Sequence, residues 1–302
     1  MDRFESMSLL LKVVETGSLS AASRELDIPL ATVSRHLSEL ETRIGAQLLV
    51  RSSRRTTLTE TGLTYVASAR RILEQLKDAE LAASGAYSEP KGTLFITAPM
   101  VLGRTHMAPL VAEFLQAYPQ IDVRMHLCDE ISPLIDRQID LAVRIGHLPD
   151  SGLIAAEIGS VRRVTCASPA YLAKRGIPQT PGDLAHHDCV TFDNLASPDF
   201  WRTADEQADR AIPVRSRLVV NTADAALRAA EEGVGMTRLL SYMVVNSVRE
   251  GRLSIVLQPF EASPWPVHLV YPKQQPAPRK LSAFLAFALP RLRARFAMEL
   301  LP

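Results

Sequence analysis

Residues 16–62, TGSLSAASRELDIPLATVSRHLSELETRIGAQLLVRSSRRTTLTETG, decide how the N-terminal part of the chain folds. The run predicts a short helix over 19–26 with Ser18 as its N-cap, followed by a break at 27–29. Pro29 suits the first turn of a third helix, 30–44, because its missing N–H would have no intrahelical partner there. Apolar residues line one side of this third helix, namely Val33, Leu37, Leu40 and Ile44. The pattern predicts a helix-turn-helix that can place one helix in a DNA major groove.

The segment before this run predicts a first helix that ends at Gly17, with an apolar stripe made of Phe4, Met7, Leu10, Leu11 and Val14. A plain helical bundle with a polar outer face would show the same pattern. The residues that follow favour DNA binding instead. Between positions 43 and 55 there are four arginines and no acidic residue, interleaved with serine and threonine. Guanidinium groups and short hydroxyls are the groups that contact phosphate, so a basic hairpin, or wing, is predicted here.

The positive charge of this region is balanced by acidic residues elsewhere, because the whole chain carries a formal net charge of only +1. A run of like charges is usually a solvated surface. At hairpin distance from a helix-turn-helix it more often contacts DNA. Binding would therefore depend on this patch and on dimerisation rather than on a globally basic protein.

The segments SLSAASREL, ATVSRHLSELETRIGAQLLVR and LTETG resemble the winged helix-turn-helix of LysR-type transcriptional regulators. The resemblance extends over essentially the whole chain and implies double-stranded promoter DNA as a partner. The family often begins its recognition helix with a Ser-Gln-Pro-like run, whereas this chain has Pro29, Leu30 and Ala31. Base reading is therefore assigned to Thr32, Arg35 and His36, with Ser34 on phosphate. The candidate DNA-binding residues are Ser18, Thr32, Ser34, Arg35, His36, Arg51, Arg54 and Arg55.

A long helix is predicted over 60–83, with Thr59 as its N-cap and a seam near the coiled-coil period formed by Leu63, Val66, Leu73 and Leu76. Such a helix can pack back on its own chain or pair with a second subunit. The resemblance implies a linker helix in a homodimer or homotetramer, which would hold two reading helices for a dyad-symmetric target.

The remaining residues alternate strand and helix patterns, as in a mostly parallel sheet covered by helices. The expected fold class is α/β: a winged helix-turn-helix and linker helix, then a two-lobed α/β domain like type 2 periplasmic solute-binding proteins. The expected boundaries are 1–59 for the DNA-binding domain, 60–90 for the linker, 91–163 with 268–302 for lobe I, and 164–267 for lobe II. The chain would cross between the lobes near residues 165–167 and 266–268.

Ligands of open α/β sheets bind beyond the carboxyl ends of the strands, where helix N-termini offer N–H groups. This rule selects the candidate effector-binding residues Pro99, Met100, Val101, Asp129, Arg144, Gly146, Phe192, Asn221, Thr222 and Thr237. Asn221 and Thr222 can equally serve as helix caps. Arg144, within an apolar strand, either pairs with an acid such as Asp129 or Asp140 or binds an anionic effector. The set is compatible with a small carboxylate among many other molecules.

Three cysteines, Cys128, Cys166 and Cys189, bear on the compartment. No apolar run follows the N-terminal MDRFESM, so no signal peptide is predicted. No stretch reaches the roughly 20 apolar residues of a membrane span. We expect a cytoplasmic protein with reduced thiols and no membrane association. Some members of the family sense oxidants through a cysteine pair, but Cys166 and Cys189 lie in strand-like runs typical of buried thiols. The HHDC run at 186–189 lacks the spacing of strong metal sites, so no metal or cofactor is predicted.

Three classes of function account for different parts of the sequence. A solute-binding protein of a transporter would explain the two-lobed domain but not residues 1–90. An enzyme would need a nucleophile or an acid–base set, and the chain has no nucleophile elbow, phosphate loop or dinucleotide fingerprint. The sequence favours a regulator whose promoter binding responds to a small-molecule effector between the lobes, with RNA polymerase as a further partner if it activates transcription.

Overall fold

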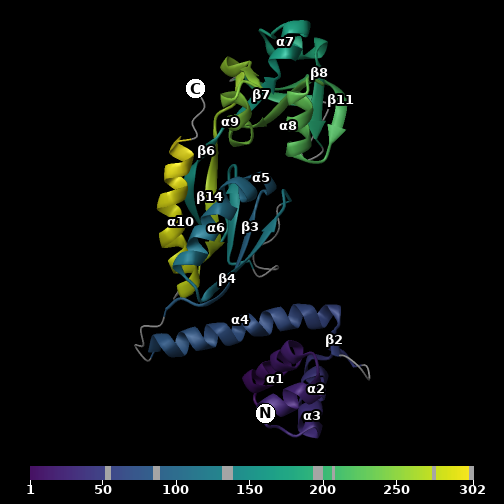
Figure 1. The fold of residues 1–302 in the computed structure, drawn as a ribbon, viewed down its shortest axis with the longest axis vertical. Helices are drawn as coiled ribbons and strands as arrows, with labels where there is room; N and C mark the ends of the chain where they lie inside the picture. Colours follow the sequence, from purple (N-terminus) through teal and green to yellow (C-terminus); the bar gives the residue numbers. More distant parts are fainter. Residues whose placement is uncertain are drawn as a thin grey trace. The chain divides into compact units, whose positions relative to one another are not determined.

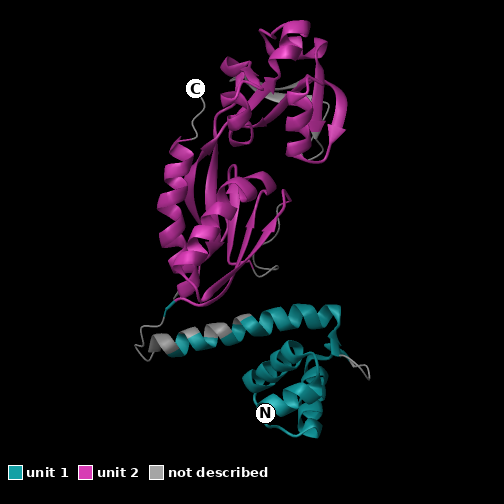
Figure 2. Cartoon of the chain, viewed as in Figure 1, with its two compact units in different colours: residues 1–89 teal, residues 90–302 magenta. Residues whose placement is uncertain are grey.

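The computed structural model describes residues 1–51, 56–83, 89–130, 139–192, 200–205, 208–273 and 277–298. The chain forms two compact units, Met1–Glu89 and Pro90–Pro302 (Figure 2). In the part of the chain that the structure describes, no helix combines the length and apolar character needed to cross a membrane.

The first unit is a helical bundle with a two-stranded hairpin and a long final helix. Its elements are α1 (Arg3–Thr16), α2 (Leu19–Leu26), α3 (Leu30–Ile44), β1 (Leu49–Arg51), β2 (Thr56–Leu58) and α4 (Glu60–Ala83). The bounds predicted for α2, α3 and α4 are confirmed. Gly17 and Gly45 end α1 and α3 in the left-handed region, at φ values of 70° and 75°, where glycine lacks the steric penalty of a Cβ.

The buried stripe of α1 differs from the predicted one. Ser6, Leu9, Leu10 and Val13 are buried, whereas Phe4 is 42% exposed. The stripe is thus rotated by about one position, because the buried side of α1 is the side that contacts α2, α3 and α4. In α3, the inward positions Val33, Leu37 and Leu40 are fully buried, as predicted.

Side chains at the base of the hairpin hold it against α3 and α4. The Glu41 carboxylate at the end of α3 accepts hydrogen bonds from the backbone N–H groups of Leu48 and Leu49, at 2.8 and 3.0 Å. The Thr59 hydroxyl donates to the Gln47 carbonyl and accepts from the Gly62 N–H, which caps α4 as predicted. A Cβ on Gly62 would lie 2.0 Å from the Leu48 carbonyl oxygen, so only glycine fits this contact.

The first half of α4 packs on its own unit. Val66 is buried in the hydrophobic cluster of the bundle, Ala69 is also buried, and α4 contacts α1. Leu63, a residue of the predicted seam, is 59% exposed in the single chain, and Ile72 is also exposed. The buried side of α4 therefore runs through Gly62, Val66 and Ala69, and Leu63 lies off it.

The second unit contains two five-stranded sheets, seen as two lobes in Figure 1. Lobe I has the strand order β4-β3-β5-β14-β6. Its elements are β3 (Gly92–Ala98), α5 (Met100–Leu102), a π-helical turn (Gly103–Met107), α6 (Ala108–Ala117), β4 (Ile121–Leu127), β5 (Leu141–Ile145), β6 (Leu153–Val161), β14 (Trp265–Pro272) and α10 (Arg279–Met298). Strands β3, β4 and β5 are parallel, and β14 is antiparallel to both of its neighbours. Helices α6 and α10 cover the sheet through Phe114 and Phe284, whose ring centroids are 5.0 Å apart.

Lobe II has the order β11-β8-β12-β7-β13. Its elements are β7 (Arg163–Ala167), α7 (Pro169–Arg175), a 3-10 helix (Pro181–His186), β8 (Asp188–Phe192), the hairpin β9 (Phe200–Asp205) and β10 (Ala208–Pro213), β11 (Arg215–Val220), α8 (Ala223–Glu231), β12 (Met236–Leu240), α9 (Ser241–Arg249), β13 (Ser254–Val256) and a 3-10 turn (Gln258–Phe260). Strands β11, β8 and β12 are parallel, as the sequence pattern predicts.

The chain crosses between the sheets at Arg162 and again between Phe260 and Trp265. Both crossings come earlier than the predicted 165–167 and 266–268. Residues 165–167 lie inside β7 of lobe II, and residues 266–268 lie inside β14 of lobe I, because each crossing occurs just before a strand starts.

Candidate DNA interface and effector site

Helix α3 presents a polar face opposite its buried residues. Arg35 has a side chain that is 66% exposed, and Thr32, Ser34 and His36 are half-buried at the edges of the same face. The spacing of the buried residues Val33 and Leu37 forces these four polar positions outward. The structure therefore brings together the predicted base-reading residues on one helix surface.

Sequence reasoning missed Glu39, which faces two of these residues. Its carboxylate lies 3.7 Å from the Arg35 Nε and 3.2 Å from the His36 Nδ1. The sequence spacing could have revealed this contact, because residues three and four apart on a helix are neighbours. Two of the three candidate base readers, Arg35 and His36, therefore have a partner in the protein itself, and a base edge must compete with this carboxylate for them.

The other predicted DNA contacts differ in how far the structure describes them. The Ser18 Oγ caps α2 by accepting from the Ala21 N–H at 3.4 Å, and its hydroxyl proton remains a donor. Arg51 ends strand β1, although its side chain is not among those described. Arg54 and Arg55 lie outside the described residues.

In lobe I, most of the predicted effector-binding residues are buried or already form hydrogen bonds within the fold. Pro99 precedes α5, the Met100 N–H donates to the Asp129 carboxylate at 3.0 Å, and Val101 is buried. The Gly146 N–H donates to the Pro266 carbonyl at 2.8 Å. An anion at this helix start would have to share the Met100 N–H with Asp129.

Arg144 and its two suggested acids lie on lobe I. Burial lowers the pKa of the half-buried Arg144 guanidinium, while the neighbouring Cys128 raises it. Asp140 accepts from the Phe95 N–H at 2.9 Å and lies 3.8 Å from the buried Lys280 ammonium. The Asp140 carboxylate therefore links Lys280 of α10 to strand β3 of the sheet.

The lobe II candidates separate into surface and core positions. Asn221 is exposed, and the Thr222 hydroxyl caps α8 by accepting from the Ala225 N–H at 3.3 Å. Thr237 is fully buried and donates to the Val190 carbonyl at 3.0 Å, so the structure does not bring it together with Asn221. The side chain of Phe192 is not among those described.

Two groups that sequence reasoning missed lie where the lobes meet. The Arg104 guanidinium of lobe I forms a 2.7 Å ion pair with Asp224 of α8 in lobe II. The Tyr242 ring of α9 packs edge-on against His106 of lobe I, at 5.8 Å between centroids. Its hydroxyl is buried with no hydrogen-bond partner among the described residues, and burial raises its pKa, as do Asp129 and Asp224. Tyr242 was missed because the sequence did not reveal α9.

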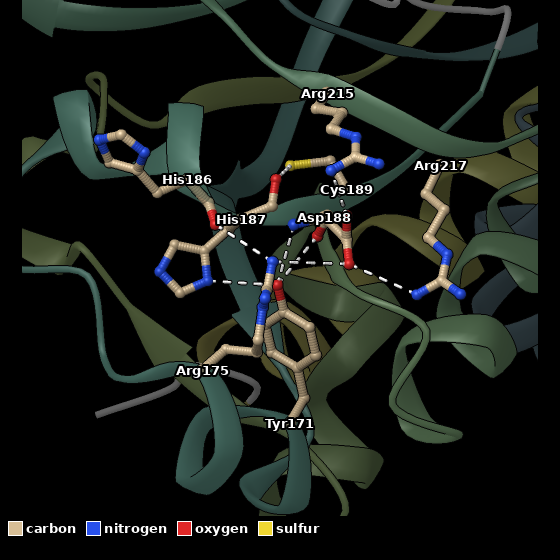
Figure 3. A network of polar contacts seen from close by, with 8 residues as sticks. All are labelled: Tyr171, Arg175, His186, His187, Asp188, Cys189, Arg215 and Arg217. Carbon is tan, nitrogen blue, oxygen red and sulfur yellow. Dashed lines mark hydrogen bonds and ion pairs between the residues drawn. The ribbon is translucent and has the colours of Figure 1, made fainter.

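The HHDC run at 186–189 belongs to a polar network on lobe II (Figure 3). The Asp188 carboxylate lies 3.4 to 3.8 Å from the guanidinium groups of Arg175, Arg215 and Arg217. The His187 Nδ1 lies 3.2 Å from the Tyr171 hydroxyl, and His186 takes part through its carbonyl. Burial and the nearby Arg175 lower the pKa of His187. These groups hold α7 against β8 and β11.

The buried cysteines have the character expected of structural thiols. Cys166 and Cys189 are fully buried, and burial raises the pKa of each thiol to about 12. They pack into different hydrophobic clusters on opposite faces of the lobe II sheet, which is not the geometry of a disulfide. This argues against the redox-sensing alternative for this pair.

A winged helix-turn-helix unit joined to a two-lobed α/β unit is the architecture of a DNA-binding regulator. Residues 4–63 match the family model for bacterial regulatory helix-turn-helix proteins of the lysR family, and residues 88–293 match the LysR substrate binding domain. The chain belongs to the LysR family of transcriptional regulators, which are not enzymes.

Several relatives cover nearly the whole chain. An HTH-type transcriptional regulator of Xanthomonas campestris pv. campestris is 37% identical over 288 residues, which cover 94% of this chain and 84% of the relative. The HTH-type transcriptional activator AaeR of Escherichia coli is 30% identical over 285 residues, covering 94% and 92%. Among solved structures, CrgA of Neisseria meningitidis, a LysR-type transcriptional regulator, has a TM-score of 0.61 at 32% identity and covers 95% and 98%.

Proposed function

We propose that the protein binds promoter DNA as a homodimer or homotetramer and that a small-molecule effector bound between the lobes modulates this binding. The observation that carries the proposal is the outward face of α3, where Thr32, Arg35 and His36 stand over a fully buried apolar side. A helix supported in this way can enter a major groove without losing its packing.

Within this proposal, the residues divide by the group they contact. Thr32, Arg35 and His36 read base edges. Phosphate contacts come from Ser18, Ser34, Arg51, Arg54 and Arg55. Phosphate contacts carry little sequence information but dominate the dependence on salt.

The division is tested by replacing Arg54 and Arg55 together with alanine in the full chain. Fluorescence anisotropy with a duplex from the gene-proximal promoter and with a scrambled duplex should show similar losses of affinity for both. The slope of log affinity against log salt should become shallower by about two to four for a bound dimer, because up to four phosphate contacts, two from each copy, are removed. An unchanged salt slope would show that these two arginines do not contact phosphate.

The proposed oligomer rests on α4. Its exposed Leu63, a residue of the predicted seam, lies off the side that packs on the bundle, so this apolar side chain is available to a second copy. Two copies would present two α3 helices to the two halves of an inverted repeat.

The proposed effector site lies at the meeting of the lobes, where Arg144, Asn221, Thr222 and the unpaired Tyr242 hydroxyl supply polar groups. An effector shifts DNA binding only to the extent that it prefers one arrangement of the lobes. RNA polymerase would be the further partner at an activated promoter.

A thermal-shift screen of metabolites against the full chain tests the effector part. A hit should raise the melting temperature, change the anisotropy titration with promoter DNA, and lose its effect in Tyr242→Phe. A ligand that stabilises the protein but leaves DNA affinity unchanged in every promoter fragment would contradict the proposed coupling.

A further inference from the structure

The first turn of α3 exposes apolar side chains. Leu30, the first residue of the helix, is 45% exposed, and Ala31 is also exposed. Pro29 precedes them and makes no side-chain hydrogen bond to the helix. The outward surface of α3 is therefore apolar in its first turn, and its polar side chains begin at Thr32.

The fold does not use these two side chains in its core. Helix α3 takes part in the hydrophobic cluster of the first unit through Val33, Leu37 and Leu40, which are buried. Leu30 and Ala31 stay outside that cluster as the described residues define it. A single exposed leucine is common on protein surfaces, so its place on the helix has to decide what it does.

The place of these residues is next to the proposed base readers. Ala31 precedes the exposed Arg35 by four residues, and Leu30 precedes Ser34 by four, so each pair shares one side of the helix. In a helix-turn-helix protein, the N-terminal residues of the recognition helix are those that contact base edges. With Arg35 over one base pair, the side chains of Leu30 and Ala31 face the base pairs about one helical turn, or about 5.4 Å, away.

The chemistry of the major groove selects what an apolar side chain can read. The C5 methyl of thymine is the methyl group that unmodified base pairs present there, and the other groups that distinguish the bases are hydrogen-bond donors and acceptors. An apolar side chain against a donor or acceptor displaces water without replacing its hydrogen bonds, which costs free energy. Leucine and alanine side chains therefore favour a base pair that turns a thymine methyl group toward them.

We propose that Leu30 and Ala31 recognise a thymine in each half-site through van der Waals contact with its C5 methyl group. The inference rests on the proposed function, because it requires α3 to lie in the major groove. It adds an apolar specificity determinant to Thr32, Arg35 and His36, which act through hydrogen bonds. The thymine should lie within about two base pairs of the base that Arg35 reads, because one helical turn of about 5.4 Å spans one to two base-pair steps of about 3.4 Å.

Replacing thymidine with deoxyuridine tests the contact, because the change removes the methyl group and keeps every hydrogen-bonding group of the base. The gene-proximal promoter fragment is prepared once with thymidine and once with deoxyuridine at every thymidine position. Anisotropy titrations with the full chain should show a higher affinity for the thymidine duplex. The expected ratio is about fourfold per half-site, or about fifteenfold for a bound dimer, which corresponds to one buried methyl group in each half-site.

Variants separate a direct contact from an effect of the methyl groups on the shape of the DNA. Leu30→Ala should reduce the ratio of the two affinities at least about threefold, because the side chain that faces the methyl group is shortened. The matched control is Leu26→Ala, which changes an exposed leucine at the end of α2 and should keep the wild-type ratio. Circular dichroism checks that each variant is folded. If Leu30→Ala does not fold, Leu30→Gln takes its place and should also reduce the ratio.

The outcomes distinguish this inference from the proposed function. Equal affinity of the wild type for both duplexes would overturn the methyl contact and leave promoter binding intact. A ratio that stays unchanged in a folded Leu30 variant would overturn it as well, because the methyl groups would then act through DNA shape. Absence of binding to either duplex would contradict promoter binding itself, and the inference would fall with it.

Discussion

At the scale of single residues, the proposed DNA-binding surface depends on side chains that already have partners. Arg35 and His36 share the carboxylate of Glu39, and Ser18 caps α2. The sequence could place Arg35 and His36 on the outer face because Val33 and Leu37 define the inner one. It could not reveal where Glu39 points, since the rotamers of three long or flexible side chains decide that contact.

Arg35→Ala should weaken binding to the specific promoter site by about 1–3 kcal/mol and relax base preference, because a guanidinium that reads a base edge contributes on this scale. Anisotropy titrations with the specific duplex and with single-base variants measure both effects. Arg3→Ala, an exposed arginine at the start of α1, is the control and should leave affinity nearly unchanged. Equal affinity of Arg35→Ala and wild type would show that another part of α3 reads the bases.

The three cysteines should differ in reactivity. Because burial raises the pKa of Cys166 and Cys189 to about 12, only about one thiol in ten thousand is ionised at pH 8. Ellman's reagent should therefore label at most the half-buried Cys128 in the native protein and all three thiols in guanidinium chloride. Rapid labelling of two or three thiols in the folded protein would revive the redox-sensing alternative.

At the scale of elements, the junction of hairpin and long helix is the most constrained part of the first unit. Glu41 holds the start of β1, Thr59 caps α4, and Gly62 passes the Leu48 carbonyl too closely for any side chain. The positions of β1 and β2 relative to α3 follow from these contacts.

Gly62→Ala should destabilise the protein by about 1–3 kcal/mol, because the added methyl group would overlap a backbone oxygen that cannot move freely. Chemical denaturation followed by circular dichroism measures the change. The control is Thr61→Ala at the adjacent, exposed position, which should shift the midpoint little. A Gly62→Ala protein as stable as wild type would mean that the junction relaxes easily.

Elements with a clear apolar period could be predicted from the sequence, and those defined by tertiary contacts could not. Helices α2, α3 and α4 have the predicted bounds because N-caps, glycines and an apolar period mark them locally. Strand β6, the β9–β10 hairpin and helix α9 were not foreseen. The pattern of α9 (SYMVVNSVR) is mixed, because both the sheet and lobe I contact it. The candidate effector positions came from a rule about strand ends, which cannot distinguish the exposed Asn221 from the buried Thr237.

At the scale of the whole molecule, the central claim is that two copies place two α3 helices on one promoter. Each unit has its own hydrophobic core, so the DNA-binding surface and the two-lobed domain are complete as folded bodies. Regulation then requires that the assembly hold two reading helices at a fixed spacing.

Hydroxyl-radical footprinting of the full chain on the gene-proximal promoter tests this claim most directly. Two protected tracts are expected on one face of the duplex, with centres separated by about 10 base pairs or a multiple of that spacing, and both should be lost in Arg35→Ala. A single protected tract, protection without periodicity, or no protection even at low salt would contradict it.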